Sequence, residues 1–237
     1  MRFAIVGLQR TGSSYLVHLL GSHPEIHCCG EIFNTGSLNL RWPKEMERRR
    51  ETTRALREMR TRDPQEFLEG MFALDFGTRA TGFKIFPSQN PAMFERILDD
   101  RSIAKIVHSR ENGLARYASL RAARATGDFV GYEEKPLVEF KARRFKEFLD
   151  EHAAFFDGLE RRLTADGQRF HRSRFEDFKY PERMTPILEF LGVAPTLPPL
   201  MAPPANTGPS DVLSRFSNPE DAEAYLREHN LMHWARE

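Results

Sequence analysis

The sequence predicts an α/β protein, a P-loop-like three-layer sandwich in which helices flank a central parallel sheet. Three observations lead to this prediction. Short apolar segments typical of buried strands alternate with longer segments of helical periodicity along the 237 residues. A glycine loop joins the first of these strands to the first helix. A second strongly apolar strand is closely followed by an arginine, at the edge where parallel sheets bind ligands.

Apolar runs and turn residues place the elements in order along the chain. Strands are expected at 3–7, around 26–33, and at 81–86, 102–108 and 168–175. Helices are expected at 13–22, 44–62, about 64–75, 91–100, 112–126, 137–164, 181–191 and 218–230. Proline in the first turn favours a helix start at 91, and glycine favours helix ends at 127 and 192.

The expected helix at 137–164 carries a stripe of phenylalanines along one side: Phe140, Phe145, Phe148, Phe155 and Phe156. This spacing is typical of a face that packs into the core. Further along, Asn218 before Pro219 is the expected cap of the last helix. Residues 193–210 are rich in proline, which predicts an ordered irregular crossing or a lid.

Bulk composition bounds the class of protein. The length suits a single domain over residues 1–237, with a helical insertion at about 40–78 and a proline-rich segment at about 193–237. A net charge of +1 gives no field to attract nucleic acid, and no apolar stretch approaches the roughly 20 residues of a transmembrane helix. The first strand begins next to Met1, so we expect no signal peptide and a cytoplasmic protein.

The first loop has the glycine spacing of a phosphate loop but not its lysine. Gly7 and Gly12 stand in the G-x-x-x-x-G pattern between a strand and a helix. Ser13 and Ser14 follow in place of lysine with serine or threonine, and the positive charge lies earlier, at Arg10. Such a loop can hold an anion with backbone N–H groups and the helix N-terminus. The missing lysine favours a nucleotide whose reacting anion is not the γ-phosphate of ATP.

A second anion site is predicted at a neighbouring strand end. Arg110 follows the strand at 102–108, and Ser119 lies in the next helix. Both can converge on one phosphate, because ligands bind at the carboxyl ends of parallel strands. Two anion sites at neighbouring strand ends suggest a nucleotide phosphorylated at both its 5′ and 3′ positions. Lys84 in the strand at 81–86 and Glu31 complete the candidate set.

Four motifs in register resemble the sulfotransferases that use 3′-phosphoadenosine 5′-phosphosulfate (PAPS). Residues 9–16 resemble that family's 5′-phosphosulfate loop, and residues 107–119 resemble its 3′-phosphate motif. Residues 82–84 (Gly-Phe-Lys) and 174–178 (Arg-Phe-Glu-Asp-Phe), with a later Phe-Leu-Gly-Val run, match two further landmarks. The similarity spans residues 3 to about 193. It is greatest to the bacterial branch that modifies carbohydrates or lipids, in which nodulation-factor and trehalose sulfotransferases fall.

The resemblance implies a set of residues that bind PAPS. Those that would hold the 5′-phosphosulfate are Arg10, Thr11, Gly12, Ser13 and Ser14. Arg110 and Ser119 would hold the 3′-phosphate, where arginine offers a bidentate grip and a permanent charge. Tyr15 would pack on the adenine. Phe175 stands where cytosolic relatives that act on phenols and steroids have a tyrosine near adenine.

The resemblance also implies that Glu31, Lys84 and Arg10 are the catalytic residues. Those cytosolic relatives place a catalytic histidine shortly after the residue that matches Lys84, but Ile85 and Phe86 stand here. The general base is therefore assigned to Glu31, which matches the glutamate of the trehalose branch. Arg10 and Lys84 would neutralise the transferring sulfuryl group and the leaving phosphate, so no metal is expected. The implied acceptor is a small molecule with a hydroxyl group, a carbohydrate or a glycolipid.

Two other functions stay open at this stage. A P-loop kinase or NTPase would use the same first loop, and turnover of magnesium-bound ATP would support it. A non-catalytic nucleotide-binding protein would keep the fold and bind the nucleotide product without turnover. The sequence leaves the oligomeric state open, a homodimer included.

Three features have a structural alternative to a role in the site. His108 ends a strand and is either a base or a packed, hydrogen-bonded histidine. Four residues of the types that bind zinc lie close together in the sequence: His23, His27, Cys28 and Cys29. Structural zinc sites favour two ligand pairs that are well separated in sequence, and no second cluster is present here. These two cysteines are the only ones, which excludes a disulfide framework. The basic helix at 44–62 is either solvated and laced with ion pairs or a lid over the acceptor.

Overall fold

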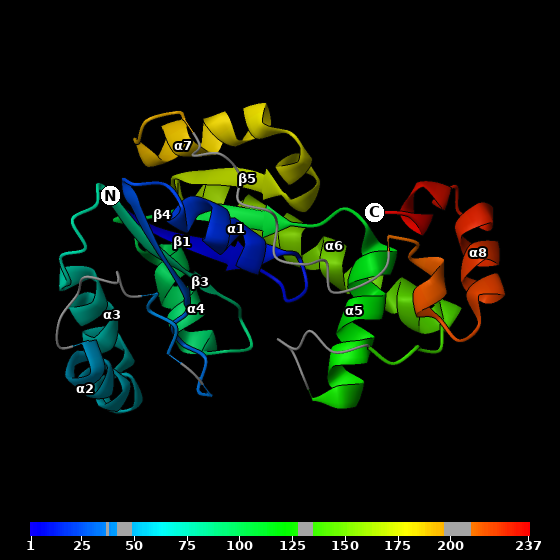
Figure 1. Ribbon diagram of the computed structural model, residues 1–237, viewed down its shortest axis with the longest axis horizontal. Helices are drawn as coiled ribbons and strands as arrows, with labels where there is room; N and C mark the ends of the chain where they lie inside the picture. Colours follow the sequence, from blue (N-terminus) through cyan, green and yellow to red (C-terminus); the bar gives the residue numbers. More distant parts are fainter. Residues whose placement is uncertain (37, 42–48, 128–134, 197–209) are drawn as a thin grey trace. The chain divides into compact units, whose positions relative to one another are not determined.

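The five strands of the computed structural model form one parallel sheet in the order β2-β3-β1-β4-β5 (Figure 1). The structure describes residues 1–36, 38–41, 49–127, 135–196 and 210–237. The strands are β1 (Arg2–Gly7), β2 (Ile26–Glu31), β3 (Ala80–Ile85), β4 (Ile103–Ser109) and β5 (Phe170–Arg174). Helices flank this central sheet, so the predicted fold class is confirmed.

The chain divides into two compact units. Unit 1 comprises residues 1–8, 12–109 and 162–200, and therefore holds the whole sheet. Unit 2 comprises residues 9–11, 110–161 and 201–237. The predicted first loop is thus shared, since its middle residues belong to unit 2 and its glycine at the start of the first helix belongs to unit 1.

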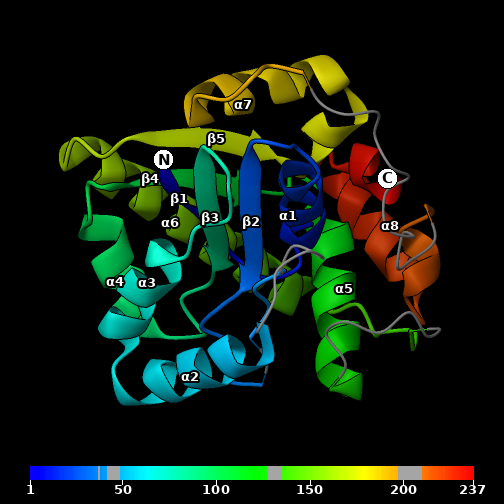
Figure 2. The same cartoon turned by 60° about the vertical axis from the view of Figure 1, so that its left-hand side comes forward.

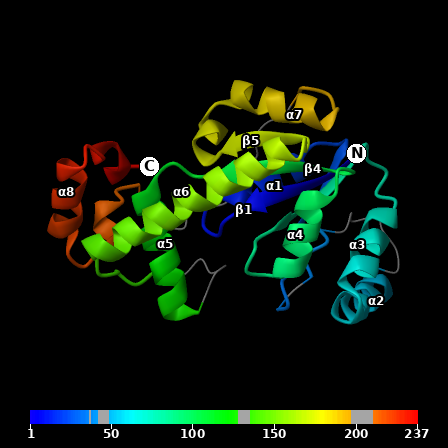
Figure 3. The same ribbon diagram turned by 180° about the vertical axis from the view of Figure 1, so that it is seen from behind.

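One face of the sheet in unit 1 is covered by α1 (Ser13–Gly21) and α7 (Thr185–Leu191). Phe3 and Ile5 of β1 point to this face because alternate side chains of a strand point to opposite sides. The apolar residues of both helices pack on them in one buried cluster. Helix α4 (Pro91–Asp99) lies on the opposite face (Figures 1 and 3). This division agrees with right-handed crossovers between parallel strands.

The remaining helices of unit 1 follow strands β2 and β5 in the chain. Helices α2 (Arg49–Arg62) and α3 (Pro64–Ala73) follow β2 and pack against each other (Figure 2). Asp63 caps α3 by accepting the backbone N–H groups of Gln65 and Glu66. Two short 3-10 helices, η1 (Phe175–Lys179) and η2 (Pro181–Met184), lead from β5 to α7.

Unit 2 is helical and has its own aromatic core. It contains α5 (Gly113–Thr126), most of α6 (Ala142–Ala165), η3 (Leu213–Arg215), α8 (Pro219–Glu228) and η4 (Met232–Ala235). Tyr117 lies at the centre of this core, with the rings of Phe145 and Phe148 at 5.2 and 5.4 Å from its own. Aromatic pairs at this separation add to the stability that burial alone provides.

The long helix α6 begins later than its sequence pattern predicts. The expected start at residue 137 is wrong, because Val138 forms a parallel β-bridge with Phe216. Phe140 is buried in the core of unit 2 but precedes the helix. Its backbone N–H donates to the side chain of Asn218 at 2.8 Å, and its carbonyl accepts from the same side chain at 3.1 Å. Asn218 stands at the N-cap position of α8 as predicted, but its side chain makes no capping bond there.

The other predicted elements agree with the structure within a few residues. The helix expected at 181–191 is η2 followed by α7. Part of the basic helix (42–48) and most of the proline-rich segment (197–209) lie outside the described residues. The predictions for those stretches, and that of a single domain with an insertion, stay predictions.

Candidate functional site

The register of two strands in unit 1 brings a carboxylate and an ammonium group together. Glu31 of β2 pairs with Lys84 of β3, whereas three residues earlier Cys28 pairs with Gly82. β2 therefore contains one extra residue between these pairs, a β-bulge. The bulge aligns Glu31 with Lys84, and Oε1 of Glu31 lies 3.0 Å from Nζ of Lys84. The two predicted catalytic residues of unit 1 are thus neighbours.

Lys84 also reaches the first helix. Its Nζ donates a hydrogen bond to Oγ of Ser14 at 2.7 Å, and only 4% of the residue is exposed. Ser14 stands in the first turn of α1, directly after the glycine loop. The adjacent strand therefore places a buried positive charge beside the phosphate-type loop, which lacks a lysine of its own.

The carboxylate of Glu31 is held by three donors. Oε2 accepts hydrogen bonds from Nδ2 of Asn34 and Nε2 of Gln89, both at 2.8 Å, while Oε1 faces Lys84. Burial by itself would raise the pKa of Glu31. The positive charge of Lys84 and the hydrogen bonds from Asn34, Lys84 and Gln89 outweigh burial, so the pKa lies below its usual value. Glu31 is therefore ionised at neutral pH and oriented by its neighbours.

These neighbours are themselves anchored, and sequence reasoning missed them. Oε1 of Gln89 accepts the backbone N–H of Phe86 at 3.2 Å, which turns its amide nitrogen toward the carboxylate. The guanidinium of Arg60 in α2 donates to the carbonyls of Ile32 and Asn34 at 2.9 and 2.7 Å. No motif in the sequence points to these residues, because their role depends on which loops the fold brings together.

The start of α1 is shaped by the close approach of an aromatic ring. Gly12 has φ +80°, in the left-handed region, and a Cβ there would overlap the ring of Phe175. Ser13 is buried, and Tyr15 lies partly buried with its ring at 5.2 Å from that of Phe178. The two aromatic residues come from η1, so the motif at 174–178 packs against the loop motif within unit 1.

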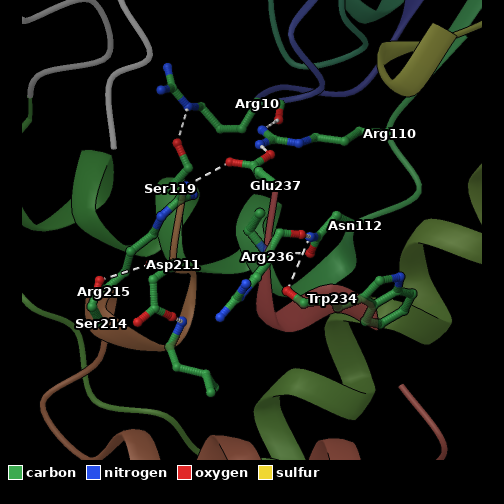
Figure 4. A network of polar contacts seen from close by, with 12 residues as sticks. Arg10, Arg110, Asn112, Ser119, Asp211, Ser214, Arg215, Trp234, Arg236 and Glu237 are labelled. Carbon is green, nitrogen blue, oxygen red and sulfur yellow. Dashed lines mark hydrogen bonds and ion pairs between the residues drawn. The ribbon is translucent and has the colours of Figure 1, made fainter. Parts of the chain in front are cut away.

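A second polar group lies in unit 2 (Figure 4). Nε of Arg10 donates to Oγ of Ser119 at 2.8 Å, and a guanidinium nitrogen of Arg110 donates to the backbone carbonyl of Arg10 at 3.2 Å. Arg10 has φ 63°, a left-handed conformation that is uncommon for a residue with a side chain. Thr11 beside it is fully buried. Four predicted cofactor residues are thus in unit 2, three of them linked through their side chains or backbone.

Glu237 is part of this group, although its position in the sequence gave no sign of it. Its carboxylate forms ion pairs with Arg110 through Oε1 and with Arg215 through Oε2, the latter at 2.6 Å (Figure 4). Nδ2 of Asn112, the N-cap of α5, donates to the carbonyls of Trp234 and Arg236 at 3.1 Å. This amide fixes the backbone that carries Glu237 next to the start of α5.

Arg116 is a further residue that contacts this group and that sequence reasoning missed. It is only 4% exposed, and its Nε donates to the backbone carbonyl of Gln9 at 3.1 Å. Its guanidinium also lies over the ring of Phe148, at 4.4 Å from the centroid. Burial lowers the pKa of Arg116 to about 10, and the nearby Arg124 adds to that effect. The residue holds the loop backbone directly before Arg10. Its position within the motif at 107–119, in the helix that follows Arg110, is the signal that could have found it.

The predicted site residues thus fall into two groups. Glu31 and Lys84 join Ser14 in unit 1, where Gly12, Ser13 and Tyr15 also lie. Arg110, Ser119, Arg10 and Thr11 lie in unit 2. Within its unit, Arg10 contacts Ser119, which the resemblance assigned to the other phosphate. The catalytic and binding roles remain predictions.

The three histidines that the sequence analysis singled out are buried and have hydrogen-bonding partners. His108 is fully buried, stacks on Phe178 at 5.4 Å and has Nδ1 at 3.2 Å from Oγ of Ser173. His23 and His27 each place a ring nitrogen on a backbone carbonyl, those of Ala194 and Leu40.

The thiols of Cys28 and Cys29 are buried. Burial raises the pKa of Cys28 to about 12 and that of Cys29 well above its usual value. Among the residues that the structure describes, no three His, Cys, Asp or Glu side chains are grouped to hold a metal.

The described part of the basic helix carries ion pairs one turn apart. Arg54 pairs with Glu58 at 3.0 Å, and Arg62 pairs with Glu66 of α3 at 2.8 Å. These pairs are exposed, as expected for a solvated helix face. Within the described ranges, every helix is too short or too polar to cross a membrane.

The parallel sheet, its glycine loop and the lysine that reaches the first helix define an α/β protein of the kind that binds ligands at the carboxyl ends of its strands. The sequence model of the family described as "Sulfotransferase family" matches residues 3–196, so the chain belongs to the sulfotransferase family. This confirms the predicted family, and sulfuryl transfer is its general chemistry.

Among solved structures, a sulfotransferase from Alicyclobacillus acidocaldarius is similar to this chain. The two share 19% sequence identity, with a TM-score of 0.47, and the similarity covers 99% of this chain and 98% of that one. The search of curated proteins gave no match.

Proposed function

We propose that this sulfotransferase moves a sulfuryl group from PAPS to a hydroxyl group of a carbohydrate or glycolipid acceptor. The observation that supports it most is the contact of Lys84 with both Ser14 and Glu31. That contact combines, in one buried group, a positive charge beside a phosphate-type loop and an ionised carboxylate. Sulfuryl transfer to an alcohol needs both features, since negative charge develops on the leaving phosphate and the acceptor must lose a proton.

Each unit contains residues that would suit one of the two anionic groups of PAPS. In unit 1, Ser13, Ser14 and the N-terminus of α1 would hold the 5′-phosphosulfate together with Lys84. In unit 2, Arg110 and Ser119 would hold the 3′-phosphate. Arg110 already binds an anionic group in unit 2, since it forms an ion pair with the carboxylate of Glu237. PAPS, when bound, supplies the activated sulfuryl group.

Glu31 acts as the general base in this proposal. Its Oε2 is occupied by two amide donors, which leaves Oε1, on the side of Lys84, as the atom that takes the proton of the acceptor hydroxyl. Such proton transfer is worth about 10²–10⁴-fold in rate. The ammonium group of Lys84 lies beside Oε1 of Glu31 and would stabilise the oxygen atoms on which negative charge develops.

Titration calorimetry of the purified protein with 3′-phosphoadenosine 5′-phosphate (PAP), the nucleotide product, tests the cofactor. We expect PAP to bind without magnesium, and the Arg110→Ala variant to lose this binding. Arg144→Ala, a change of an exposed arginine in the same unit, is the matched control and should bind like the parent. Binding of ATP with magnesium but not of PAP would overturn the proposal in favour of a kinase or NTPase.

Transfer of ³⁵S from labelled PAPS to a panel of sugars and glycolipids tests the acceptor. We expect labelled product with the parent protein and a loss of about 10²–10⁴-fold with Glu31→Gln, which keeps the size of the side chain and removes the base. Labelling of phenols or amines but of no sugar would overturn the acceptor class. Tight PAP binding with no transfer to any hydroxyl, amine or phenol would favour the non-catalytic alternative.

A further inference from the structure

The carboxylate of Glu237 lies between two arginines of unit 2. Arg110 pairs with Oε1 and Arg215 with Oε2, so both oxygens of one carboxylate are engaged (Figure 4). Exposed fractions are small for all three side chains, at 9% for Arg110, 9% for Glu237 and 13% for Arg215. Ion pairs that are largely removed from water are screened less by salt than pairs on the surface.

Backbone contacts fix Glu237 in this position. Its N–H donates to the carbonyl of Ser210 at 2.9 Å, and Asp211 forms an antiparallel bridge with Arg236. Together with the contacts of Asn112 described above, these bonds tie the strand-like segment at 236–237 to the start of α5. The side chain is therefore placed among the arginines by the fold of unit 2.

The carboxylate provides the negative charge that these arginines need in the absence of another anion. The guanidinium groups of Arg110 and Arg215 both approach this carboxylate. Buried cations close together repel one another and lose hydration. A phosphate group on Arg110 would supply the same kind of charge-assisted contact as the carboxylate does. The carboxylate of Glu237 and a phosphate group are therefore alternative partners of the Arg110 guanidinium.

We infer that Glu237 is a specificity-determining residue, whose carboxylate occupies the 3′-phosphate position and is displaced when a 3′-phosphorylated nucleotide binds. The inference rests on the proposed function, since it takes Arg110 as the ligand of that phosphate. The nucleotide has to break the ion pairs of Glu237 before its 3′-phosphate can bind Arg110. The free energy lost with these pairs offsets part of the free energy gained from the phosphate contact. A nucleotide without a 3′-phosphate leaves these pairs intact. Glu237 thus lowers the preference of the protein for 3′-phosphorylated nucleotides.

Calorimetry with PAP and adenosine 5′-monophosphate (AMP) tests the inference, since the two ligands differ only in the 3′-phosphate. We expect Glu237→Gln and Glu237→Ala to bind PAP about tenfold tighter than the parent, which corresponds to removing one competing charged contact. AMP affinity should stay within about twofold. Glu228→Gln, an exposed carboxylate on α8 with the same change in net charge, is the control and should leave both affinities unchanged.

The outcomes separate this inference from the proposed function. If the parent binds PAP and Arg110→Ala abolishes that binding, but the Glu237 variants bind PAP equally or more weakly, the inference is wrong and the proposed function stands. If PAP and AMP weaken together and the Tm falls in the Glu237 variants, Glu237 has only a structural role, which also overturns the inference. If the parent fails to bind PAP, the proposed function itself fails.

Discussion

Nζ of Lys84 lies 2.7 Å from Oγ of Ser14, so a lysine of β3 reaches the residue that follows the glycine loop of β1. The two strands are hydrogen-bonded neighbours, and Lys84 pairs in register with Ile5, which is two residues before the first loop glycine. A phosphate loop of the nucleotide kinases carries its lysine within the loop. Here the same kind of charge comes from the adjacent strand, and it also contacts a carboxylate.

This relationship predicts that Lys84→Met lowers the rate of sulfuryl transfer much more than it weakens nucleotide binding. A positive charge is needed most where negative charge develops in the transition state, so we expect kcat to fall about 10²–10³-fold. PAP affinity should fall less than about tenfold in the same variant. Steady-state kinetics and calorimetry measure the two effects. Lys179→Met, at an exposed position of unit 1, is the control, and equal losses of rate and affinity in Lys84→Met would contradict the prediction.

The hydrogen bond from Gln89 predicts a change in the pH profile. Gln89→Ala removes one of the donors that keep the pKa of Glu31 low, so this pKa should rise. Glu31 acts as a base only when ionised, above its pKa, so the acid limb of kcat/KM should move to higher pH. Gln65→Ala, which removes an amide bound to the exposed Glu69, should leave the profile in place. An unchanged acid limb in Gln89→Ala would show that Glu31 is not the base.

The close approach of Phe175 to Gly12 predicts a coupling between the two positions. Gly12→Ala should destabilise the protein through two effects, the left-handed φ, which costs about 1–2 kcal/mol with a Cβ, and overlap with the Phe175 ring. Phe175→Ala removes only the overlap. Urea unfolding of the parent, both single variants and the double variant should show that Gly12→Ala costs less in the Phe175→Ala background. An equal cost in both backgrounds would place the whole effect in the backbone.

The buried Lys105 predicts that stability increases with pH above neutrality. Its Nζ donates to the carbonyl of Asp100 at 2.5 Å and to Oε1 of Gln168 at 2.7 Å, and the residue is fully buried. Burial lowers its pKa to about 8, below the usual value of 10.5. Between these two pKa values the unfolded chain binds the extra proton, so the free energy of unfolding rises with pH.

Chemical denaturation at several pH values measures this effect. The slope contributed by Lys105 should approach about 1 kcal/mol per pH unit within that window. Other groups titrate there too, among them the buried thiol of Cys28, whose raised pKa acts in the opposite direction. The difference between the parent and Lys105→Met isolates the lysine. Parallel curves for these two proteins would rule the effect out.

Most of the fold could be predicted from local patterns. The strands have apolar runs, and several helices begin at proline or end at or next to glycine, so the bounds of these elements agree closely with the structure. The start of α6 could not be predicted, because it depends on Phe216 and Asn218, far along the chain. Phe140 belongs to the phenylalanine stripe from which the helix was predicted, yet its backbone and that of Val138 bond to those distant residues instead.

The sequence predicted which residues belong to the candidate site, but not which of them contact one another. Motif similarity pointed to Lys84 and Glu31, but their contact depends on strand order and on a one-residue bulge, neither of which has a sequence signature. Gln89 was missed because a glutamine after a strand has many ordinary roles. Glu237 was missed for the same reason, since only the fold brings its carboxylate to Arg110.

The bulge in β2 has a consequence for how this chain can vary. Side chains alternate between the two faces of a strand, so the extra residue between Cys28 and Glu31 decides on which face the carboxylate emerges. If this stretch paired regularly from Cys28 onward, without the bulge, Gly30 would lie opposite Lys84 and Glu31 would point to the other face. The place of the carboxylate in this chain therefore depends on the one-residue irregularity of the strand pairing as well as on the identity of the residue.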